Sequence, residues 1–205
     1  MSVARPVIAI DVDDVLAHSV EHFRQSVNKK TGSALTPDHF KVPGPYHKYF
    51  QSILESNGID HESIKDDLFQ SMVNDQTRVM PQPGAIAALQ ALAQVNDLVV
   101  ITARPPEWEP QTHIWLESHY PGVFKNVYFA GNRHDPTGKT KGQMCVEVGA
   151  GYLIDDNPEH CLAAIESGVT PILFGEFGWH VNIPIDMVRC KNWNEVQEFF
   201  GAART

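Results

Sequence analysis

The chain has 205 residues, of which 42% are hydrophobic and 20% are charged, and its formal net charge is −9 at pH 7. Such a composition is typical of a globular protein, and the length suits one domain with a modest insertion. The acidic balance argues against a nucleic-acid polymer as partner, because the phosphate backbone is held by clustered Lys and Arg side chains.

The cysteines and the N-terminus place further limits on the chain. Cys145, Cys161 and Cys190 are widely spaced and form no CxxC pair, so neither a disulfide framework nor a thiolate zinc site is predicted. Too few apolar residues precede Asp11 for the core of a signal peptide, and no apolar run approaches the ~18 residues of a membrane span. We therefore expect a cytoplasmic location and no membrane partner.

The first predicted element is the apolar run Val7 to Ile10, which is typical of a fully buried strand in a parallel sheet. Three acidic residues, Asp11, Asp13 and Asp14, follow it almost at once. In open α/β sheets, ligands bind just beyond the carboxyl ends of the strands. Asp11 and Asp13 therefore stand where chemistry is expected, whereas Asp14 suits a structural role as a cap of a helix or turn.

The next stretch, residues 17–80, contains no convincing buried strand. Helices are predicted at 21–28 and 52–57, and the Pro-Gly-Pro sequence of residues 43–45 requires a turn. We expect a small, mostly helical cap, inserted after the first strand and lying over the site. Tyr46 and Tyr49 are candidate contacts for a substrate ring, although aromatic residues are also needed for the core of such a cap.

From residue 81 onward, apolar runs alternate with helical patterns. Four more parallel strands are predicted, at 98–101, 127–130, 151–154 and 171–174. Helical spacing is found at 84–95, 107–119, 142–148, 158–167 and 194–200. The predicted fold class is α/β, with a Rossmann-like, five-stranded parallel sheet sandwiched by helices. Residues 1–16 and 81–205 would form this core, and residues 17–80 the cap.

Polar residues also follow the second and fourth strands or precede the fourth. They are Thr102, Arg104, Lys141, Asp155 and Asp156; Ala103, between Thr102 and Arg104, adds a backbone N–H group. Because the carboxyl ends of parallel strands share one edge of the sheet, we expect these residues to converge with Asp11 and Asp13. Two unit charges about 4 Å apart repel by roughly 4 kcal/mol at an effective dielectric of about 20, so this many carboxylates need a cation. Mg²⁺ suits oxygen ligands and leaves positions for phosphate oxygens.

The order of these residues along the strand ends suggests their roles. Asp11 would be the nucleophile that forms an aspartyl-phosphate. Asp13 would protonate the leaving oxygen and later activate water. Thr102 and Lys141, with backbone N–H groups such as that of Ala103, would hold the phosphoryl oxygens of the substrate.

The metal ligands are expected to be Asp11, Asp13, Asp155 and Asp156. Asp13 would contribute its carbonyl oxygen, Asp155 would bind directly, and Asp156 would act through a water or a hydrogen bond. Two assignments stay open at this point. Arg104 would either bind the substrate phosphate or brace Asp156 or a loop, and Lys139 is close enough to Lys141 to take its role. Residues 131–134, after the third strand, are further candidates for contact with the site.

The set Asp11-x-Asp13-x-Val15, Thr102, Lys141 and Asp155-Asp156 resembles the four motifs of the haloacid dehalogenase (HAD) superfamily. Residues 11–16, 101–105 and 153–158 are most similar to the 5′-nucleotidase, deoxy (pyrimidine), type C branch, whose small cap is inserted after the first motif (C1 type). The resemblance implies a Mg²⁺-dependent phosphomonoester hydrolase that works through an aspartyl-phosphate. Its implied partner is a small phosphorylated metabolite, such as a nucleoside or deoxyribonucleoside 5′-monophosphate.

Other functions remain as alternatives. The chain could be a phosphatase for a sugar phosphate or a phosphoprotein. It could be a dehalogenase or phosphonate hydrolase on the same fold, which Asp13 argues against because only a leaving oxygen needs a proton. It could also be a non-catalytic binding or regulatory protein, which the complete motifs argue against. Either a monomer or a homodimer is compatible with the sequence.

Overall fold

A computed structural model describes residues 4–130, 138–184 and 186–202 of the chain. At its centre is a six-stranded parallel sheet with the order β3-β2-β1-β4-β5-β6, which is the order of a Rossmann-like sheet. The strands are β1 (Val7–Ile10), β2 (Asp97–Thr102), β3 (Asn126–Phe129), β4 (Ala150–Asp155), β5 (Thr170–Phe174) and β6 (Val188–Cys190). The predicted α/β class is thus confirmed.

The predicted number of strands, five, is wrong by one. The additional strand, β6, lies beside β5 at the edge of the sheet and has only three residues. Arg189, at its centre, is exposed. An edge strand is solvated on one side and tolerates a charged residue, so β6 has no continuous apolar run by which it could be recognised.

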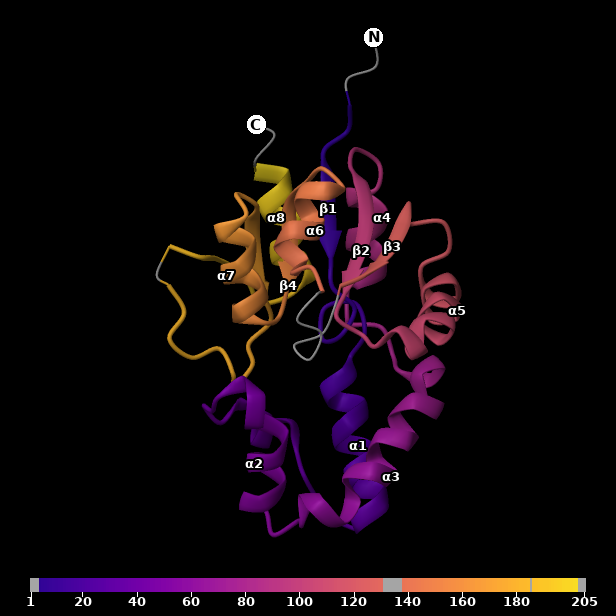
Figure 1. Ribbon diagram of the computed structural model, residues 1–205, viewed down its shortest axis with the longest axis vertical. Coiled ribbons are helices and arrows are strands. Elements are labelled where there is room, and N and C mark those ends of the chain that lie inside the picture. Colours follow the sequence, from indigo (N-terminus) through magenta and orange to yellow (C-terminus); the bar gives the residue numbers. More distant parts are fainter. Residues whose placement is uncertain (1–3, 131–137, 185, 203–205) are drawn as a thin grey trace.

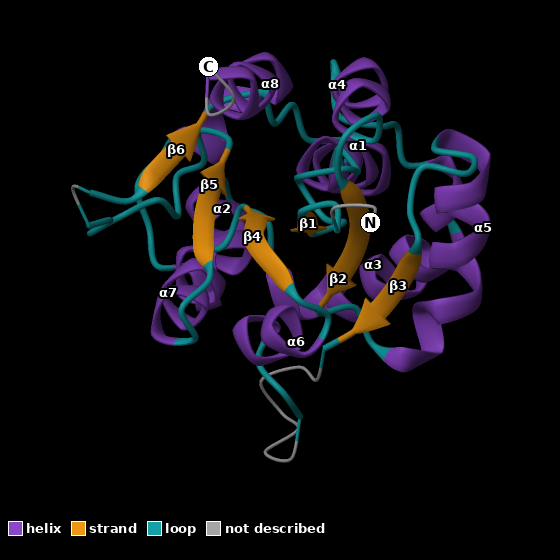
Figure 2. Cartoon of the chain, turned by 90° about the horizontal axis from the view of Figure 1, so that it is seen from above, coloured by secondary structure: helices purple, strands orange, loops and turns teal. Residues whose placement is uncertain are grey.

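Helices cover both faces of the sheet (Figure 2). They are α4 (Ala85–Leu92), α5 (Glu109–His119), α6 (Lys141–Glu147), α7 (Pro158–Glu166) and α8 (Trp193–Ala202). Side chains alternate along β1: Ile8 and Ile10 belong to a hydrophobic cluster with residues of α4, α5 and α8. Ala9 belongs to another, with residues of α6 and α7. This two-sided burial explains why the strand is apolar at every position.

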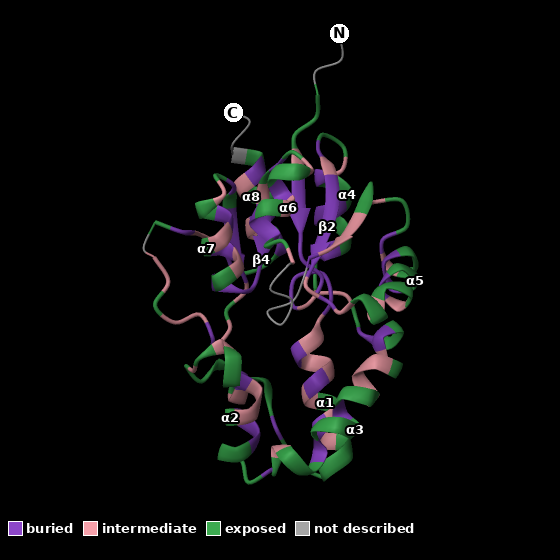
Figure 3. Ribbon diagram, viewed as in Figure 1, coloured by how far each residue is buried: buried purple, intermediate pink, exposed green. Residues whose placement is uncertain are grey.

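Three further helices lie beyond the carboxyl ends of the strands, in the lower half of Figure 1. They are α1 (Ser19–Thr31), α2 (Tyr49–Ser56) and α3 (His61–Asn74). Helix α3 was not predicted as a separate element; of its fourteen residues only Ile64 and Leu68 are buried. Figure 3 shows that the central strands β2 and β4 are largely buried, whereas α2 and α3 carry many exposed residues. In the part of the chain that the structure describes, no helix is long and apolar enough to cross a membrane.

The chain enters and leaves these three helices at adjacent points. Ala17 and Pro81 form an antiparallel bridge. His18 N donates to Met80 O (2.8 Å), and Gln82 N donates to Leu16 O (2.7 Å). The two connections therefore run side by side at the carboxyl edge of the sheet and are joined by two hydrogen bonds.

A second connection reaches the helices from the other side. Residues 175–180, which follow β5 and which we call the strap, pass beside α2 (Figure 1). Gly178 N donates to Phe40 O (3.2 Å), and Gly44 N donates to Gly178 O (3.0 Å). Trp179, only 2% exposed, belongs to the same hydrophobic cluster as residues of α1, α2 and α3. The hydrophobic core under these helices thus includes a side chain from beyond β5.

Substitution of Gly178 by alanine is expected to loosen this contact. A Cβ at position 178 would lie too close to Tyr49 Oη and Val42 O, within the distance at which atoms must move apart. Overpacking of this kind costs about 1–3 kcal/mol. We expect urea denaturation to show a loss of that size for Gly178→Ala, and no loss for Gly151→Ala, where an added Cβ meets nothing. Equal stability of the two variants would contradict the packing described.

Candidate active site

Asp11 is the first residue beyond β1 and lies at the centre of the carboxyl edge. Its neighbours are set by the register of the sheet, in which Ile10 pairs with Val100 of β2 and with Ile154 of β4. Asp11 N donates to Ile154 O (3.0 Å) and so extends the ladder by one residue. This register places the Asp11 carboxylate beside Asp155, and its side chain is only 8% exposed.

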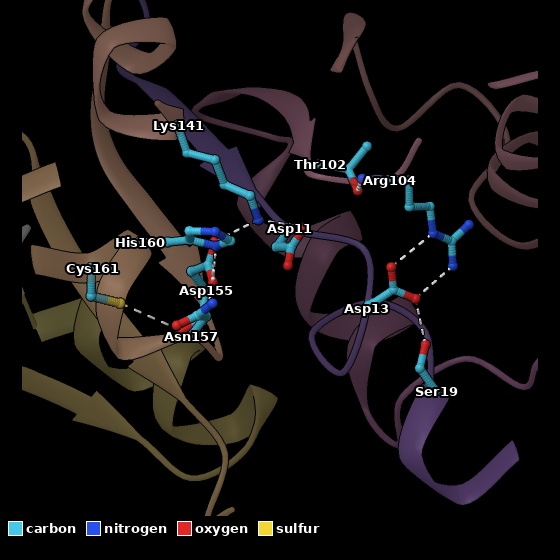
Figure 4. Close-up of polar contacts among 10 residues, drawn as sticks. All are labelled: Asp11, Asp13, Ser19, Thr102, Arg104, Lys141, Asp155, Asn157, His160 and Cys161. Carbon is cyan, nitrogen blue, oxygen red and sulfur yellow. Dashed lines mark hydrogen bonds and ion pairs between the residues drawn. The ribbon is translucent and has the colours of Figure 1, made fainter. Parts of the chain in front are cut away.

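Lys141 links these two carboxylates (Figure 4). Its Nζ lies 2.7 Å from Asp11 Oδ1 and 2.7 Å from Asp155 Oδ2, and its side chain is 1% exposed. Lys141 is the first residue of α6, which begins with a capping box between Thr140 and Gln143. Gly142 allows α6 to pack closely on α7, because a Cβ there would overlap Ala163 O.

The alternative lysine, Lys139, is directed elsewhere. Its Nζ pairs with Glu147 Oε1 at 2.7 Å, and both side chains are more than half exposed. Of the two lysines between which the sequence left the choice open, the structure places Lys141 at the carboxylates.

Asp155 and Asp156, at the end of β4, have different environments. Asp155 is completely buried, and both of its oxygens are engaged: Oδ2 by Lys141, and Oδ1 by Asn157 N (2.9 Å) and His160 Nδ1 (3.2 Å). Asp156 lines a cavity between the sheet edge and the helices. Its carbonyl oxygen accepts from Trp179 Nε1 of the strap (3.0 Å). Asp155 thus holds Lys141, and the carboxylate of Asp156 is the one of the two that could serve as a direct metal ligand.

The carboxylates fit a divalent cation. One oxygen from each of Asp11, Asp155 and Asp156 lies within 4.8 Å of the others. Asp11 Oδ1 is buried and, although Lys141 is near, has no aligned hydrogen bond. Burial, followed by the charge of Asp155, outweighs the attraction of Lys141 and raises the pKa of Asp11 to about 6. Burial and Asp155 also raise the pKa of Asp156 well above its ordinary value. An all-oxygen site with surplus negative charge is what Mg²⁺ prefers.

Asp13 points away from Lys141 and toward Arg104 (Figure 4). Arg104 Nε donates to Asp13 Oδ2 (2.8 Å), and Nη2 donates to Oδ1 (2.7 Å). Ser19 Oγ, at the start of α1, also donates to Oδ1 (2.6 Å). Burial opposes the charged form of Asp13, but Arg104 and Ser19 outweigh it, so the pKa of Asp13 lies below its ordinary value. Arg104 therefore braces Asp13, rather than Asp156 as one of the two predictions for it had suggested.

Thr102 and Ala103 lie at the end of β2, on the same cavity. Thr102 is completely buried, and its Oγ1 accepts from Arg104 N (3.2 Å). Asp14 is also at this edge, with φ at +56°. Its Oδ1 accepts from Val20 N (2.8 Å) and caps the first turn of α1. This hydrogen bond agrees with the structural role predicted for Asp14.

The cavity has a volume of about 340 Å³. Its polar end contains Asp11, Asp13, Thr102, Ala103, Arg104 and Asp156. The rest of its lining combines the polar residues Asp14, Ser19, Asn157 and His160 with a mostly apolar group: Val20, Phe23, Tyr46, Phe50, Met72, Trp108 and Trp179. The predicted site residues from β1, β2 and β4 are thus brought together, and Tyr46 faces them.

Tyr49 does not line the cavity. It is 1% exposed inside the core under α1 to α3, and its hydroxyl donates to Val42 O (2.8 Å). Its position does not support the predicted substrate contact: Tyr49 packs in this core, which was the alternative role considered for the aromatic residues of this stretch. Residues 131–134 lie outside the described residues.

Several residues at the site had no recognisable signal in the sequence. Ser19 reaches Asp13 from α1, His160 reaches Asp155 from α7, and Trp179 reaches the cavity from the strap. Each is a single polar or aromatic residue in an otherwise ordinary segment, and only the folded chain brings it to the site. For His160, its position on the first turns of the helix after Asp155-Asp156 is the one hint that the sequence holds.

Several solved structures have the same fold as this protein. A haloacid dehalogenase-like protein of unknown function, ATU0790 from Agrobacterium tumefaciens, superposes with a TM-score of 0.68 at 14% identity, over 98% of this chain and 100% of that one. A predicted phosphoglycolate phosphatase from Haemophilus somnus gives 0.63 at 17% identity, over 96% and 98%. The fold is thus the one that these haloacid dehalogenase-like (HAD) structures share.

The sequence comparisons narrow the class to a family. Residues 5–205 match the 5′ nucleotidase, deoxy (pyrimidine), cytosolic type C family, and the chain belongs to that family. A candidate nucleotidase from Bacillus cereus is 28% identical over 193 residues, which cover 91% of this chain and 93% of the relative. The resemblance found in the motifs is thereby confirmed, and the protein is a HAD-type phosphatase of the nucleotidase family.

Proposed function

We propose that the protein is a Mg²⁺-dependent phosphomonoester hydrolase that works through a phosphorylated Asp11. The observation that carries this proposal is the arrangement at the polar end of the cavity. Asp11 is paired with Lys141, Asp13 stands at the side of the same cavity, and Thr102 closes the β2 side. A nucleophile, a proton carrier and donors for phosphoryl oxygens thus share one site, as phosphoryl transfer requires.

The reaction would take place in two steps. An Asp11 oxygen attacks phosphorus, the bond from phosphorus to the leaving oxygen breaks, and that oxygen takes its proton from the Asp13 carboxyl. A water then attacks the phosphorylated Asp11 while Asp13 accepts a proton from it, and inorganic phosphate leaves. Lys141 and Thr102 stabilise the phosphoryl oxygens.

Asp11 and Asp156 would hold the cation with their carboxylates, and Asp13 with its carbonyl oxygen. When bound, Mg²⁺ would stabilise negative charge on the phosphoryl group. A solved structure with this fold, that of the candidate HAD hydrolase YfnB from Bacillus subtilis, is of the protein bound to magnesium. YfnB has a TM-score of 0.64 and 14% identity to this chain.

We propose residues 17–80 as a cap over the site and a nucleoside or deoxyribonucleoside 5′-monophosphate as the substrate. The volume of about 340 Å³ lies at the lower end of ligand pockets, which span about 300–1,000 Å³. Aromatic walls suit a flat ring, and a cap over the cavity would exclude a phosphoprotein. We also propose a cytoplasmic enzyme, monomeric or homodimeric, that needs neither a nucleic-acid polymer nor a membrane.

Phosphate release from a panel of phosphorylated metabolites would test the substrate class. We expect kcat/KM to be highest for nucleoside 5′-monophosphates, because sugar phosphates lack a flat aromatic base to pack against the apolar walls. A preference for sugar phosphates would overturn the nucleotide assignment but would still support the proposed phosphatase activity. Absence of hydrolysis across the panel in the presence of Mg²⁺ would overturn both.

The effect of Mg²⁺ on thermal stability is expected to depend on pH. The pKa of Asp11 is raised to about 6 in the metal-free protein, so Asp11 is mostly protonated below that pH and mostly ionised above it. A cation binds the ionised form, and binding to the folded state raises Tm. We expect millimolar Mg²⁺ to raise Tm clearly at about pH 8 and much less at about pH 5. The same shift at both values would contradict the assignment of Asp11 as a ligand.

A further inference from the structure

Arg104 is a buried cation whose hydrogen bonds are directed at Asp13. Its side chain is 3% exposed. Nε and Nη2 donate to the two oxygens of Asp13, while Nη1 donates to Thr112 Oγ1 of α5 (3.1 Å). The guanidinium carbon also lies 6.0 Å from the centre of the Trp108 ring. Arg104 is therefore held by contacts with three residues, Asp13, Thr112 and Trp108.

The fork of two hydrogen bonds determines how the Asp13 carboxyl is oriented. A single contact would leave the carboxyl free to turn, whereas a bidentate pair fixes its plane. Asp13 itself is 40% exposed on the cavity, so little else restrains it except the hydroxyl of Ser19. The orientation of this carboxyl thus depends mainly on Arg104.

A carboxyl group that protonates a leaving oxygen must be presented at the right distance and angle, and a misplacement of about 1 Å can cost about 100-fold in rate. From this geometry we infer that Arg104 is a positioning residue for Asp13. It acts on the leaving group through Asp13, and it is not primarily a ligand of the substrate phosphate. This inference rests on the proposed function, because it assigns Arg104 to the proton transfer in that reaction.

Two substrates with aromatic rings but different leaving groups separate the possible roles. The leaving group of benzyl phosphate is an alkoxide, which needs a proton. The leaving group of p-nitrophenyl phosphate is a stabilised phenolate, which needs none. The ratio kcat/KM includes the steps up to release of the alcohol and is not affected by later hydrolysis of phosphorylated Asp11. We expect Arg104→Met to lower kcat/KM for benzyl phosphate by about 10- to 100-fold. A general acid typically accelerates a reaction by about 10²- to 10⁴-fold, and a misplaced Asp13 should lose a part of that acceleration. The value for p-nitrophenyl phosphate should change little.

Control variants identify the route of the effect. Arg78→Met removes an arginine from an exposed pair with Asp75 (3.1 Å) and should change kcat/KM for neither substrate. Arg104→Lys keeps the charge without the fork and should recover only part of the loss. In an Asp13→Asn background, Arg104→Met should add no further preference between the substrates, because the group that it positions is gone.

Thr112→Val is a milder variant for the case that Arg104→Met does not fold. It keeps Arg104 and removes the acceptor of Nη1. It should therefore lower kcat/KM for benzyl phosphate selectively, but by less than Arg104→Met does. An equal loss for both substrates, in Arg104→Met or in Thr112→Val, would overturn the inference and indicate a phosphate contact or a general structural role. If the wild-type protein hydrolyses neither substrate, the proposed function itself fails, and the assignment of Arg104 fails with it.

Discussion

Asp11→Asn is expected to reduce phosphate release to the background level, a loss of about 10⁴-fold or more, as when other covalent nucleophiles are removed. An amide oxygen is a poor nucleophile, and asparagine also removes one negative ligand of the proposed cation. The loss should appear in kcat for every substrate, because the step that it removes is common to all of them. Steady-state phosphate release, with and without Mg²⁺, measures it.

The matched control for this variant is Asp14→Asn. Asp14 is as buried as Asp11 and lies three residues away, but its carboxylate caps α1. Asparagine tolerates a positive φ and offers an oxygen to Val20 N, so this variant should keep its activity. Asp11→Asn should remain folded, because it removes one of three crowded carboxylates. Normal turnover by Asp11→Asn would refute the covalent mechanism.

Lys141→Met is expected to cost both stability and activity. It leaves Asp11 and Asp155 buried without their common cation, and breaking a buried ion pair in this way typically costs about 3–5 kcal/mol. Activity should fall with it, because Lys141 is the expected donor to the phosphoryl oxygens. Mg²⁺ should recover part of the free energy of unfolding, since it also neutralises the carboxylates, but not the activity. Urea denaturation with and without Mg²⁺, together with phosphate release, separates these effects.

Lys139→Met is the control for Lys141→Met. Its pair with Glu147 is exposed to solvent, and such pairs contribute at most about 1 kcal/mol. If the two lysine variants lose similar amounts of stability, Lys141 does not stabilise the buried carboxylates of Asp11 and Asp155 as expected.

The part of the fold that could be predicted from the sequence is the part that follows from periodicity and burial. Strand β1 is buried on both faces and therefore reads as a continuous apolar run, so the carboxylate of Asp11 beyond it stands out. The parallel arrangement then predicts that Thr102 and Asp155 join Asp11, as the register shows. Strand β6 was not predicted, because a short edge strand needs no continuous apolar run.

The remaining features depend on contacts between side chains that are distant in sequence. Arg104 lies 91 residues from Asp13, and no pattern shows which of several carboxylates an arginine will meet. Trp179 completes a hydrophobic core whose other members come mainly from residues 20–72. From the sequence, Tyr49 could line the cavity or fill the core under these helices; in the structure it is one of the buried residues of α2.

The most direct test of the central claim is to look for a phosphoryl group on Asp11. Asp13→Asn should still accept the phosphoryl group from p-nitrophenyl phosphate, which needs no acid, but should be slow to activate the water that removes it. Acid quenching after a single turnover, followed by mass spectrometry of the peptides, should therefore show one phosphoryl group on Asp11 and none in Asp11→Asn. Product formation with no phosphoryl group on Asp11 at any time, in Asp13→Asn or in the wild-type protein, would contradict the covalent mechanism.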